Sequence, residues 1–311
     1  MTAPDAPLLR VLCGPTASGK ESVALHLAPL LGAEVLSLDS MKVYRGMDIG
    51  TSKAPAEARR RVPHHLVDCA DPSEDMSARR FTDLADGAIA GVRNRGRQVL
   101  VVGGTTLYLK ALLFGLFEGP SADLALRARL EEEARRDGTE SLHRRLAAAD
   151  PAAGSRIHPT DLRRLVRALE VVEETGGAMS PLQVEWKELR PRYPHRLLAL
   201  RRPRAELRAR IAARVRAMER EGLVEEVRRL RAAAGGLGRT ASQAIGYKEI
   251  GAFLDGAATL EAAMEKVRTR TNRLARAQET WLRSFPGMEF LDVPADEAPE
   301  ETARRAAERL R

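Results

Sequence analysis

The chain has 311 residues, of which 44% are hydrophobic and 30% charged, and this composition excludes an intrinsically disordered protein. The formal net charge of +8 favours an anionic partner such as a phosphate ligand, a nucleic acid or a membrane surface. Aromatic residues make up only 4%, which argues against a platform that stacks the bases of single-stranded nucleic acid.

The cysteine content and the N-terminus point to a reducing compartment. Cys13 and Cys69 are the two cysteines, so a disulfide framework and a C-x-x-C zinc site are both excluded. The first ten residues lack the basic-then-apolar pattern of a secretory signal. No apolar run approaches the length that spans a bilayer. We therefore expect a cytoplasmic protein without a membrane partner, and a monomer.

The first third of the chain predicts an α/β fold. Short apolar runs over 8–13 and 33–40 read as buried strands, and 64–69 as a weaker one. A helical pattern over 21–32 follows the first strand, and 97–115 reads as a strand, a Gly-Gly turn and a helix. Alternating strands and helices predict a parallel sheet with helices on both faces, here of the P-loop type.

After this region the strand signals stop and helical periodicity takes over. In the helix expected over 158–177, Thr160 is placed to cap the start and Gly176 to cap the end. We expect an all-helical insertion domain over residues 121–193. The α/β core would then consist of residues 1–120 and 194–311.

The remainder of the chain returns to the core. A strand is expected over 196–202, and a long helix from Pro203 to about residue 236. Two more helices are expected over 240–256 and 260–285, and a last strand over 288–293.

The stretch "CGPTASGKES" resembles a phosphate-binding loop between a strand and a helix, which is the context that this motif requires. Glycines allow the backbone to curl so that its N–H groups converge on an anion, and a lysine adds a point charge. The residues expected to bind the ligand are Gly14, Pro15, Thr16, Ala17, Ser18, Gly19, Lys20 and Glu21.

Glu21 stands where the motif G-x-x-x-x-G-K-[ST] has the hydroxyl that binds Mg²⁺. Its carboxylate could bind the metal itself, or Ser22 could supply the missing hydroxyl. Alternatively, Glu21 is an ordinary first-turn acid that faces solvent and interacts with the helix dipole.

Polar residues also follow two other expected strands. Asp39 ends the second strand, and in open α/β sheets the ligand binds outside the carboxyl ends of the strands. If this strand neighbours the first, Asp39 faces the loop as a metal ligand or general base; alternatively it only caps a turn. Gly103, Gly104 and Thr105 form a further strand-to-helix turn near the same crevice, or simply a tight turn.

Two pairs of arginines are spaced four residues apart and so share a helix face. They are Arg163 with Arg167, and Arg210 with Arg214. Without further observations, such arginines are expected to be solvated.

The motifs together resemble one family, the tRNA dimethylallyltransferases. The segments "GPTASGK", "LDSMKVYRGMDIGTSK", "VVGGTTLYLKALLFG", "AIGYKEI" and "QETWLRSF" carry the resemblance in order along nearly the whole chain. The chain departs from the family pattern at Glu21, where Thr or Ser is usual. It also departs at Asn272 and Ala277, where arginines are usual.

The resemblance implies a reaction. A prenyl group would move from dimethylallyl pyrophosphate to N6 of the adenosine at position 37 of a tRNA, just 3′ of the anticodon. The adenine would be flipped out of its stack, and the loop would hold pyrophosphate without serving NTP hydrolysis. Asp39 would accept the proton from N6. Lys20, Thr105, Arg214 and the loop amides, with Mg²⁺, would stabilise the departing pyrophosphate.

The resemblance also implies a tRNA interface, in which the insertion clamps the anticodon stem-loop. The residues in the matching stretches are Asp39, Ser40, Met41, Lys42, Thr105, Arg127, Arg163, Arg164, Arg167, Gln243, Gly246, Tyr247 and Lys248.

Two other functions remain open at this point. A P-loop kinase or NTPase acting on a small molecule is one, although Glu21 replaces the hydroxyl that such an enzyme usually carries. The other is a tRNA-binding protein that has lost catalysis, against which the presence of Asp39, Lys20 and Thr105 argues.

Overall fold

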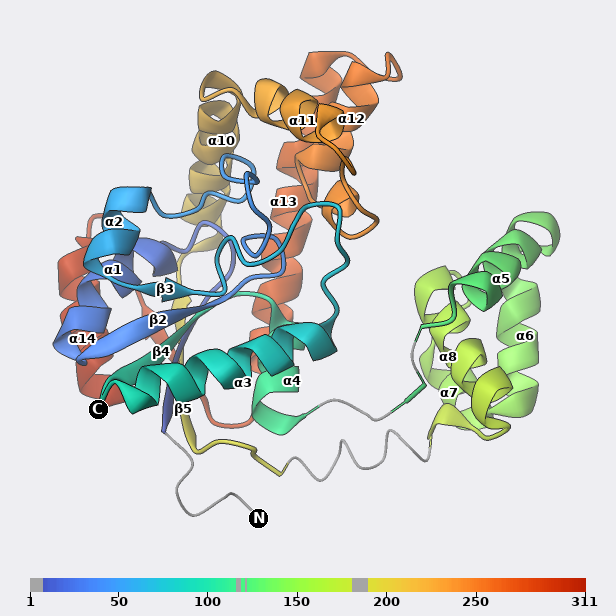
Figure 1. The fold of residues 1–311 in the computed structure, drawn as a ribbon, viewed down its shortest axis with the longest axis horizontal. Coiled ribbons are helices and arrows are strands. Elements are labelled where there is room, and N and C mark those ends of the chain that lie inside the picture. Colours follow the sequence, from blue (N-terminus) through green and yellow to red (C-terminus); the bar gives the residue numbers. More distant parts are fainter. Residues whose placement is uncertain (1–7, 116–118, 121, 181–189) are drawn as a thin grey trace. The chain divides into compact units, whose positions relative to one another are not determined.

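The computed structural model describes residues 8–115, 119–120, 122–180 and 190–311. The chain forms two compact units, one of Met1–Leu113 with Arg192–Arg311 and one of Phe114–Pro191. We call them the core unit and the helical unit (Figure 1). The helical unit begins several residues before the expected insertion of 121–193.

The core unit is built on a parallel sheet of six strands in the order β3-β2-β4-β1-β5-β6. The central strands are buried along almost their whole length, as expected where helices cover both faces of a parallel sheet. This arrangement confirms the predicted α/β fold. The strands are β1 Leu9–Cys13, β2 Ala33–Leu38, β3 His64–His65, β4 Gln98–Gly103, β5 His195–Arg201 and β6 Met288–Asp292.

The order of the strands corrects one expectation about the site. The second strand does not neighbour the first, because β4 pairs with both β1 and β2 and lies between them. The third strand was expected over 64–69 but has only two residues. Leu66 and Asp68 follow it with φ angles of +59° and +55°, which no strand can accommodate.

The helices of the core unit are α1 Lys20–Leu30, α2 Ala56–Arg61, α3 Ala78–Asn94, α4 Thr106–Phe114, α10 Arg204–Arg220, α11 Leu223–Ala232, α12 Tyr247–Leu254, α13 Leu260–Arg283 and α14 Pro299–Leu310, with a 3₁₀ turn at Ala241–Gln243. Helices α1 and α14 pack in one apolar cluster against the sheet. Helix α3 runs along the other face (Figure 1). Helices α2, α3 and α14 were not predicted from the sequence.

Two expected helices are interrupted by glycines. The long helix from Pro203 is in fact α10 and α11, which Gly222 separates with a φ of +98°. The helix expected over 240–256 is a 3₁₀ turn followed by α12, with Gly246 also at +98°. Such positive φ angles are readily available only to glycine, and each of these glycines is the N-cap at which the second helix begins.

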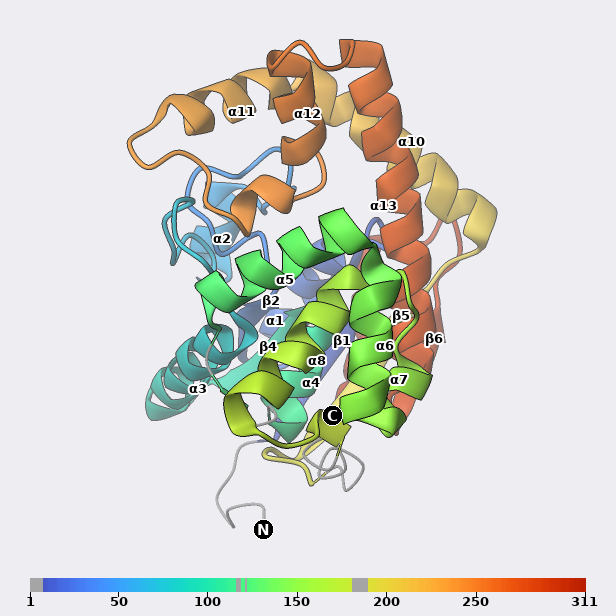
Figure 2. The same cartoon turned by 90° about the vertical axis from the view of Figure 1, so that its right-hand side faces the viewer.

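The helical unit contains α5 Leu124–Asp137, α6 Thr139–Ala149, α7 Pro151–Arg156 and α8 Leu162–Thr175 (Figure 2). Leucines and other apolar residues from all four helices form its own core. Gly176 ends α8 with a φ of +66°, as expected. The N-cap is Asp161, whose side chain accepts from Arg164 N, whereas Thr160, the expected cap, bonds to His158.

The chain leaves and re-enters the core unit at one place. The N–H of Arg192 donates to the carbonyl of Leu113 at 2.7 Å, so the two ends of the connection are hydrogen-bonded to each other. The Arg192 side chain also pairs with Asp86 of α3. None of the helices in the described residues is long and apolar enough to cross a membrane.

Candidate active site

The loop between β1 and α1 is curled tightly. Ala17 and Gly19 have φ angles of +65° and +93°, and the N–H of Ser18 donates to the carbonyl of Pro15. A side chain at Gly14 would place its Cβ 2.6 Å from the Ser18 hydroxyl, so any larger residue would displace the Ser18 side chain. The loop turns its backbone toward the N-terminus of α1, where the helix has free N–H groups.

Three arginines hold the loop, one from the connection between β5 and α10 and two from α10 itself. Arg202 donates to Ser18 O at 2.8 Å, Arg210 to Ala17 O at 2.8 Å, and Arg214 to the Thr16 hydroxyl at 2.9 Å. Arg210 is exposed to solvent, as expected, although its Nε also bonds the loop. Arg202 is buried and was not predicted as a site residue. Arg214 Nε is buried and lacks a hydrogen-bond partner among the described residues. It is a donor available to an anion.

Gln278 of α13 joins the two glycine-containing turns. Its Oε1 accepts from the N–H of Thr16 at 2.8 Å, and its Nε2 donates to the carbonyl of Gly104 at 2.8 Å. The fit is close, because a Cβ at Gly104 would lie 2.5 Å from Gln278 Nε2 and 2.9 Å from Gly14 O. Gln278 was not predicted from the sequence as a site residue.

Asp39 follows β2 and organises the turn after it. Its Oδ1 accepts from the N–H groups of Met41 at 2.8 Å and Lys42 at 3.2 Å. The Thr105 hydroxyl accepts from Ser40 N at 3.1 Å and so ties this turn to the one after β4. Asp39 thus caps a turn and also lies at the carboxyl edge of the sheet. No described residue bonds its Oδ2.

Five charged side chains are electrostatically coupled around the loop: Lys20, Lys42 and Arg214 as cations, and Glu21 and Asp39 as anions. Burial lowers the pKa of Lys20, and the charge of Glu21 opposes that change. Burial disfavours the ionised form of Glu21, but the charges of Lys42 and Lys20 outweigh it and lower its pKa. With all five ionised the cluster carries a net charge of +1, which suits an anionic ligand.

The structure gives Glu21 a partner that neither sequence interpretation foresaw. Its Oε1 lies 2.7 Å from Nζ of Lys42, whose side chain is only 6% exposed. Glu21 therefore neither faces solvent as an unpaired acid nor presents a carboxylate free of partners. Ser22, the alternative hydroxyl, is exposed to solvent.

The expected tRNA contacts of the core unit differ in exposure. Gln243 and Lys248 are exposed and bond to each other. Tyr247 is buried, and its hydroxyl donates to Glu226 at 2.5 Å, so its side chain supports the fold and is not presented to a partner. Gly246 is buried as well and is the N-cap of α12. The buried side chain of Lys42 is likewise turned inward.

The helical unit divides its expected contacts in the same way. Arg127 donates through Nε and Nη2 to the fully buried carboxylate of Glu170, at 2.7 and 2.8 Å, and Arg167 pairs with the same carboxylate. Both arginines are engaged inside the unit. Arg163 and Arg164 are exposed on α8, with Arg164 bonded to Asp161.

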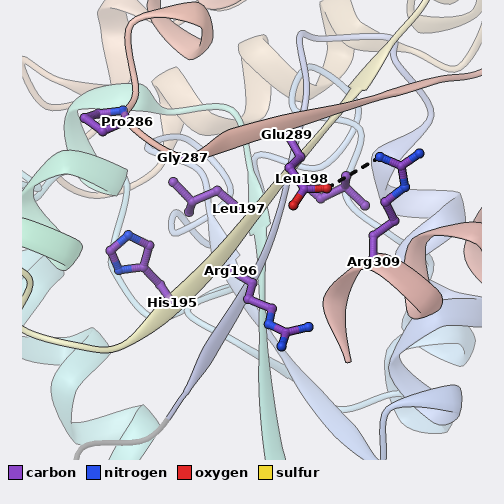
Figure 3. Close-up of a pocket in the computed structure, with 8 residues that line it drawn as sticks. All are labelled: His195, Arg196, Leu197, Leu198, Pro286, Gly287, Glu289 and Arg309. Carbon is purple, nitrogen blue, oxygen red and sulfur yellow. Dashed lines mark hydrogen bonds and ion pairs between the residues drawn. The ribbon is translucent and has the colours of Figure 1, made fainter.

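A separate cavity of about 260 Å³ lies where β5 and β6 begin, at the end of the sheet opposite to Asp39 (Figure 3). It is lined by the first residues of β5, including His195 and Arg196, and by Glu289 and Arg309, whose charged groups are 3.5 Å apart. The curled loop follows the carboxyl end of β1, whereas this cavity lies at the amino ends of β5 and β6. It is therefore distinct from the candidate active site.

Comparison with known proteins places this chain in a family. The family model described as "IPP transferase" matches residues 42–285. A tRNA dimethylallyltransferase of Anaeromyxobacter dehalogenans is 50% identical over 301 residues, covering 97% of this chain and 99% of that protein. One from Geobacter sulfurreducens is 44% identical over 288 residues, covering 93% of each.

Solved structures agree with the sequence comparisons. The tRNA isopentenylpyrophosphate transferase of Bacillus halodurans superimposes with a TM-score of 0.70 at 38% identity, over 97% of this chain and 96% of that one. A eukaryotic dimethylallyltransferase acting on tRNA gives a TM-score of 0.76 at 27% identity, over 92% and 74%. The resemblance seen in the sequence motifs is confirmed, and the chain belongs to the tRNA dimethylallyltransferase family.

Proposed function

We propose that this protein transfers a dimethylallyl group from dimethylallyl pyrophosphate to N6 of the adenosine 3′ of the anticodon, position 37, in tRNA. Family membership supports the class of reaction. The observation that carries the assignment to this site is the meeting of the curled loop, the Asp39 turn and Thr105 at the carboxyl edge of the sheet, joined by Ser40 and Gln278.

The reaction forms a C–N bond and breaks a C–O bond. The lone pair of N6 attacks the allylic carbon of the donor, and pyrophosphate leaves with the electrons of the C–O bond. Asp39 Oδ2, which no described residue bonds, accepts the N6 proton as general base. Oδ1 is held by two backbone N–H groups, so the carboxylate stays oriented while the proton moves.

The departing pyrophosphate needs compensation for its negative charge. Lys20 and Arg214 supply cations, and Arg214 Nε is a buried donor without a partner. The first N–H groups of α1 and the Thr105 hydroxyl add neutral donors. Preorganised groups of this kind stabilise charge that develops in the transition state.

The oxygen donors of the site fit Mg²⁺ in its usual role beside phosphates. The described residues contain no group of three or more His, Cys, Asp or Glu that could form a metal cage. Mg²⁺ normally takes one or two carboxylates together with phosphate oxygens and water. Because Asp39 is committed to the N6 proton, pyrophosphate oxygens and water would supply the ligands, and the bound ion would neutralise charge on the pyrophosphate.

We propose that the helical unit binds the anticodon stem-loop through its exposed arginines. Arg163 and Arg164 face solvent on α8, whereas Arg127 and Arg167 hold the unit together through Glu170. In the core unit, Gln243 and Lys248 are exposed and are proposed as further contacts.

The test is a transfer assay. Purified protein is incubated with Mg²⁺, dimethylallyl pyrophosphate and unmodified tRNA, and nucleosides are analysed by mass spectrometry. We expect N6-prenylated adenosine at position 37, and none with a tRNA whose base 37 is changed to guanosine. If the protein binds the unmodified tRNA but forms no prenylated adenosine on it, the proposed function is contradicted.

A further inference from the structure

The ion pair between Glu21 and Lys42 connects two parts of the active site that are distant in sequence. Glu21 is in the first turn of α1, directly after Lys20 of the phosphate-binding loop. Lys42 is the last residue of the turn that Asp39 organises, and its own N–H donates to Asp39 Oδ1 at 3.2 Å. The side chain of Lys42 thus anchors the Asp39 turn to the helix behind the loop.

The ion pair matters for stability because the side chain of its lysine is buried. The Lys42 side chain is 6% exposed, and its ammonium interacts unfavourably with the charge of Lys20. His64 lies close to the pair, but its Nε2 is buried without a hydrogen-bond partner among the described residues. Because Glu21 is the carboxylate that bonds the Lys42 ammonium, its removal leaves a buried and unpaired charge, which is strongly unfavourable.

The same geometry argues against Glu21 as a metal ligand. Mg²⁺ binds carboxylate oxygens at about 2.0–2.1 Å, and the Lys42 ammonium already lies 2.7 Å from Glu21 Oε1. A divalent ion on this carboxylate would stand next to a buried cation.

We propose that Glu21 is a positioning residue, which holds the Asp39 turn through Lys42, and that it is not a ligand of Mg²⁺. The inference rests on the proposed function for its catalytic consequence. The place at which a P-loop usually carries the metal-binding hydroxyl serves here to fix the general base.

The experiment compares Glu21→Gln, Lys42→Gln and the double variant in the transfer assay. A misplaced catalytic group can cost about 100-fold. We therefore expect each single variant to lose about 10- to 100-fold in kcat, with the KM for dimethylallyl pyrophosphate within about threefold of the wild type. The double variant should recover most of the loss, because neither charge is then unpaired. Glu57→Gln, an exposed first-turn glutamate of α2, is the matched control and should be silent.

A second readout does not depend on turnover. Calorimetry measures inorganic pyrophosphate binding as Mg²⁺ is varied, and urea unfolding measures stability. We expect an unchanged Mg²⁺ requirement in Glu21→Gln, and unfolding midpoints that fall in both single variants and recover in the double. A Mg²⁺ requirement raised about tenfold, without rescue by Lys42→Gln, would make Glu21 a metal ligand.

Two other results would overturn the proposal. One is full kcat in Glu21→Gln, and the other is additive losses of stability in the double variant. If the wild type made no prenylated adenosine, the proposed function would fail separately. The stability cycle would then still decide whether the two residues are coupled.

Discussion

At the scale of single residues, Asp39 caps a turn and is also the proposed general base, two roles that the sequence presented as alternatives. One carboxylate oxygen caps the turn through Met41 and Lys42, and the other has no bond from a described residue. A turn-capping aspartate is common, so the residue type alone could not decide between them. The structure places the turn on Oδ1, which leaves Oδ2 for the proposed general base.

This division predicts a difference between two substitutions. Asp39→Asn keeps an oxygen that can accept from the turn but removes the base, so kcat should fall about 10²- to 10⁴-fold while tRNA affinity stays within about twofold. Asp39→Ala should lose the same activity and also loosen the turn, lowering the unfolding temperature further. Kinetics and thermal unfolding check both; turnover by Asp39→Asn near the wild-type rate would exclude the general base.

The buried carboxylate of Glu170 allows a residue-scale prediction within the helical unit. Burial disfavours its ionisation, but hydrogen bonds from Arg127 and Arg167 prevail and lower its pKa. A lowered pKa means that ionisation of Glu170 stabilises the fold above its unfolded value of about 4.3, and that this stability is lost as pH falls through the folded pKa.

Glu170→Gln leaves two arginines without their anion, and we expect it to destabilise the protein by about 3–5 kcal/mol at pH 7. The difference from wild type should shrink as the pH is lowered below about 4. Urea unfolding of the full chain at several pH values measures this. Glu132→Gln, on an exposed pair of α5, should change stability by less than about 0.5 kcal/mol. A pH-independent difference would contradict the assignment.

At the scale of elements, the active site depends on how α13 meets two turns. Gln278 bonds Thr16 after β1 and Gly104 after β4, which are adjacent strands. The helix thereby fixes the distance between the curled loop after β1 and the Thr105 turn. This contact joins residues more than 170 positions apart.

Gly104→Ala tests this junction. Its Cβ would meet Gln278 Nε2 and the backbone of Gly14, so we expect a loss of about 1–3 kcal/mol in stability and weaker pyrophosphate binding. Gly87→Ala in α3 adds a Cβ that meets nothing within 4 Å and should be neutral or stabilising, because alanine favours helices. Unfolding and calorimetry distinguish the two; equal stability of both variants would show that the junction tolerates movement.

The sequence predicted those elements whose signals lie within a few neighbouring residues. The curled loop, the strands β1, β2 and β4, helix α13 and the end of α8 at Gly176 all have signals within a few residues. The position of β4 between β1 and β2 has no local signal, and neither does the contact of Gln278. Arg202 and Arg210 looked like ordinary arginines, because their partners are backbone carbonyls of the loop that only the fold brings near.

At the scale of the whole molecule, binding of tRNA should depend on exposed arginines and not on buried ones. Reversing Arg163 and Arg164 to glutamate should weaken tRNA binding and reduce the slope of affinity against salt. Reversing Arg135 and Arg136, exposed residues at the end of α5, is a control with the same change in net charge. Dissociation constants for tRNA at 50 and 200 mM salt are measured for both variants. Equal losses of affinity would show that only the net charge of the protein matters.

The hydrogen bond between Arg192 and Leu113 has a consequence for the ancestry of the fold. The two ends of the inserted segment already meet across 2.7 Å, so a short turn could close the core without moving either strand or helix. The closure entropy of a chain grows only slowly with its length, and inserts of very different size would therefore cost the core nearly the same. Such a junction lets a lineage exchange, lengthen or rebuild its helical unit while the core unit is left intact.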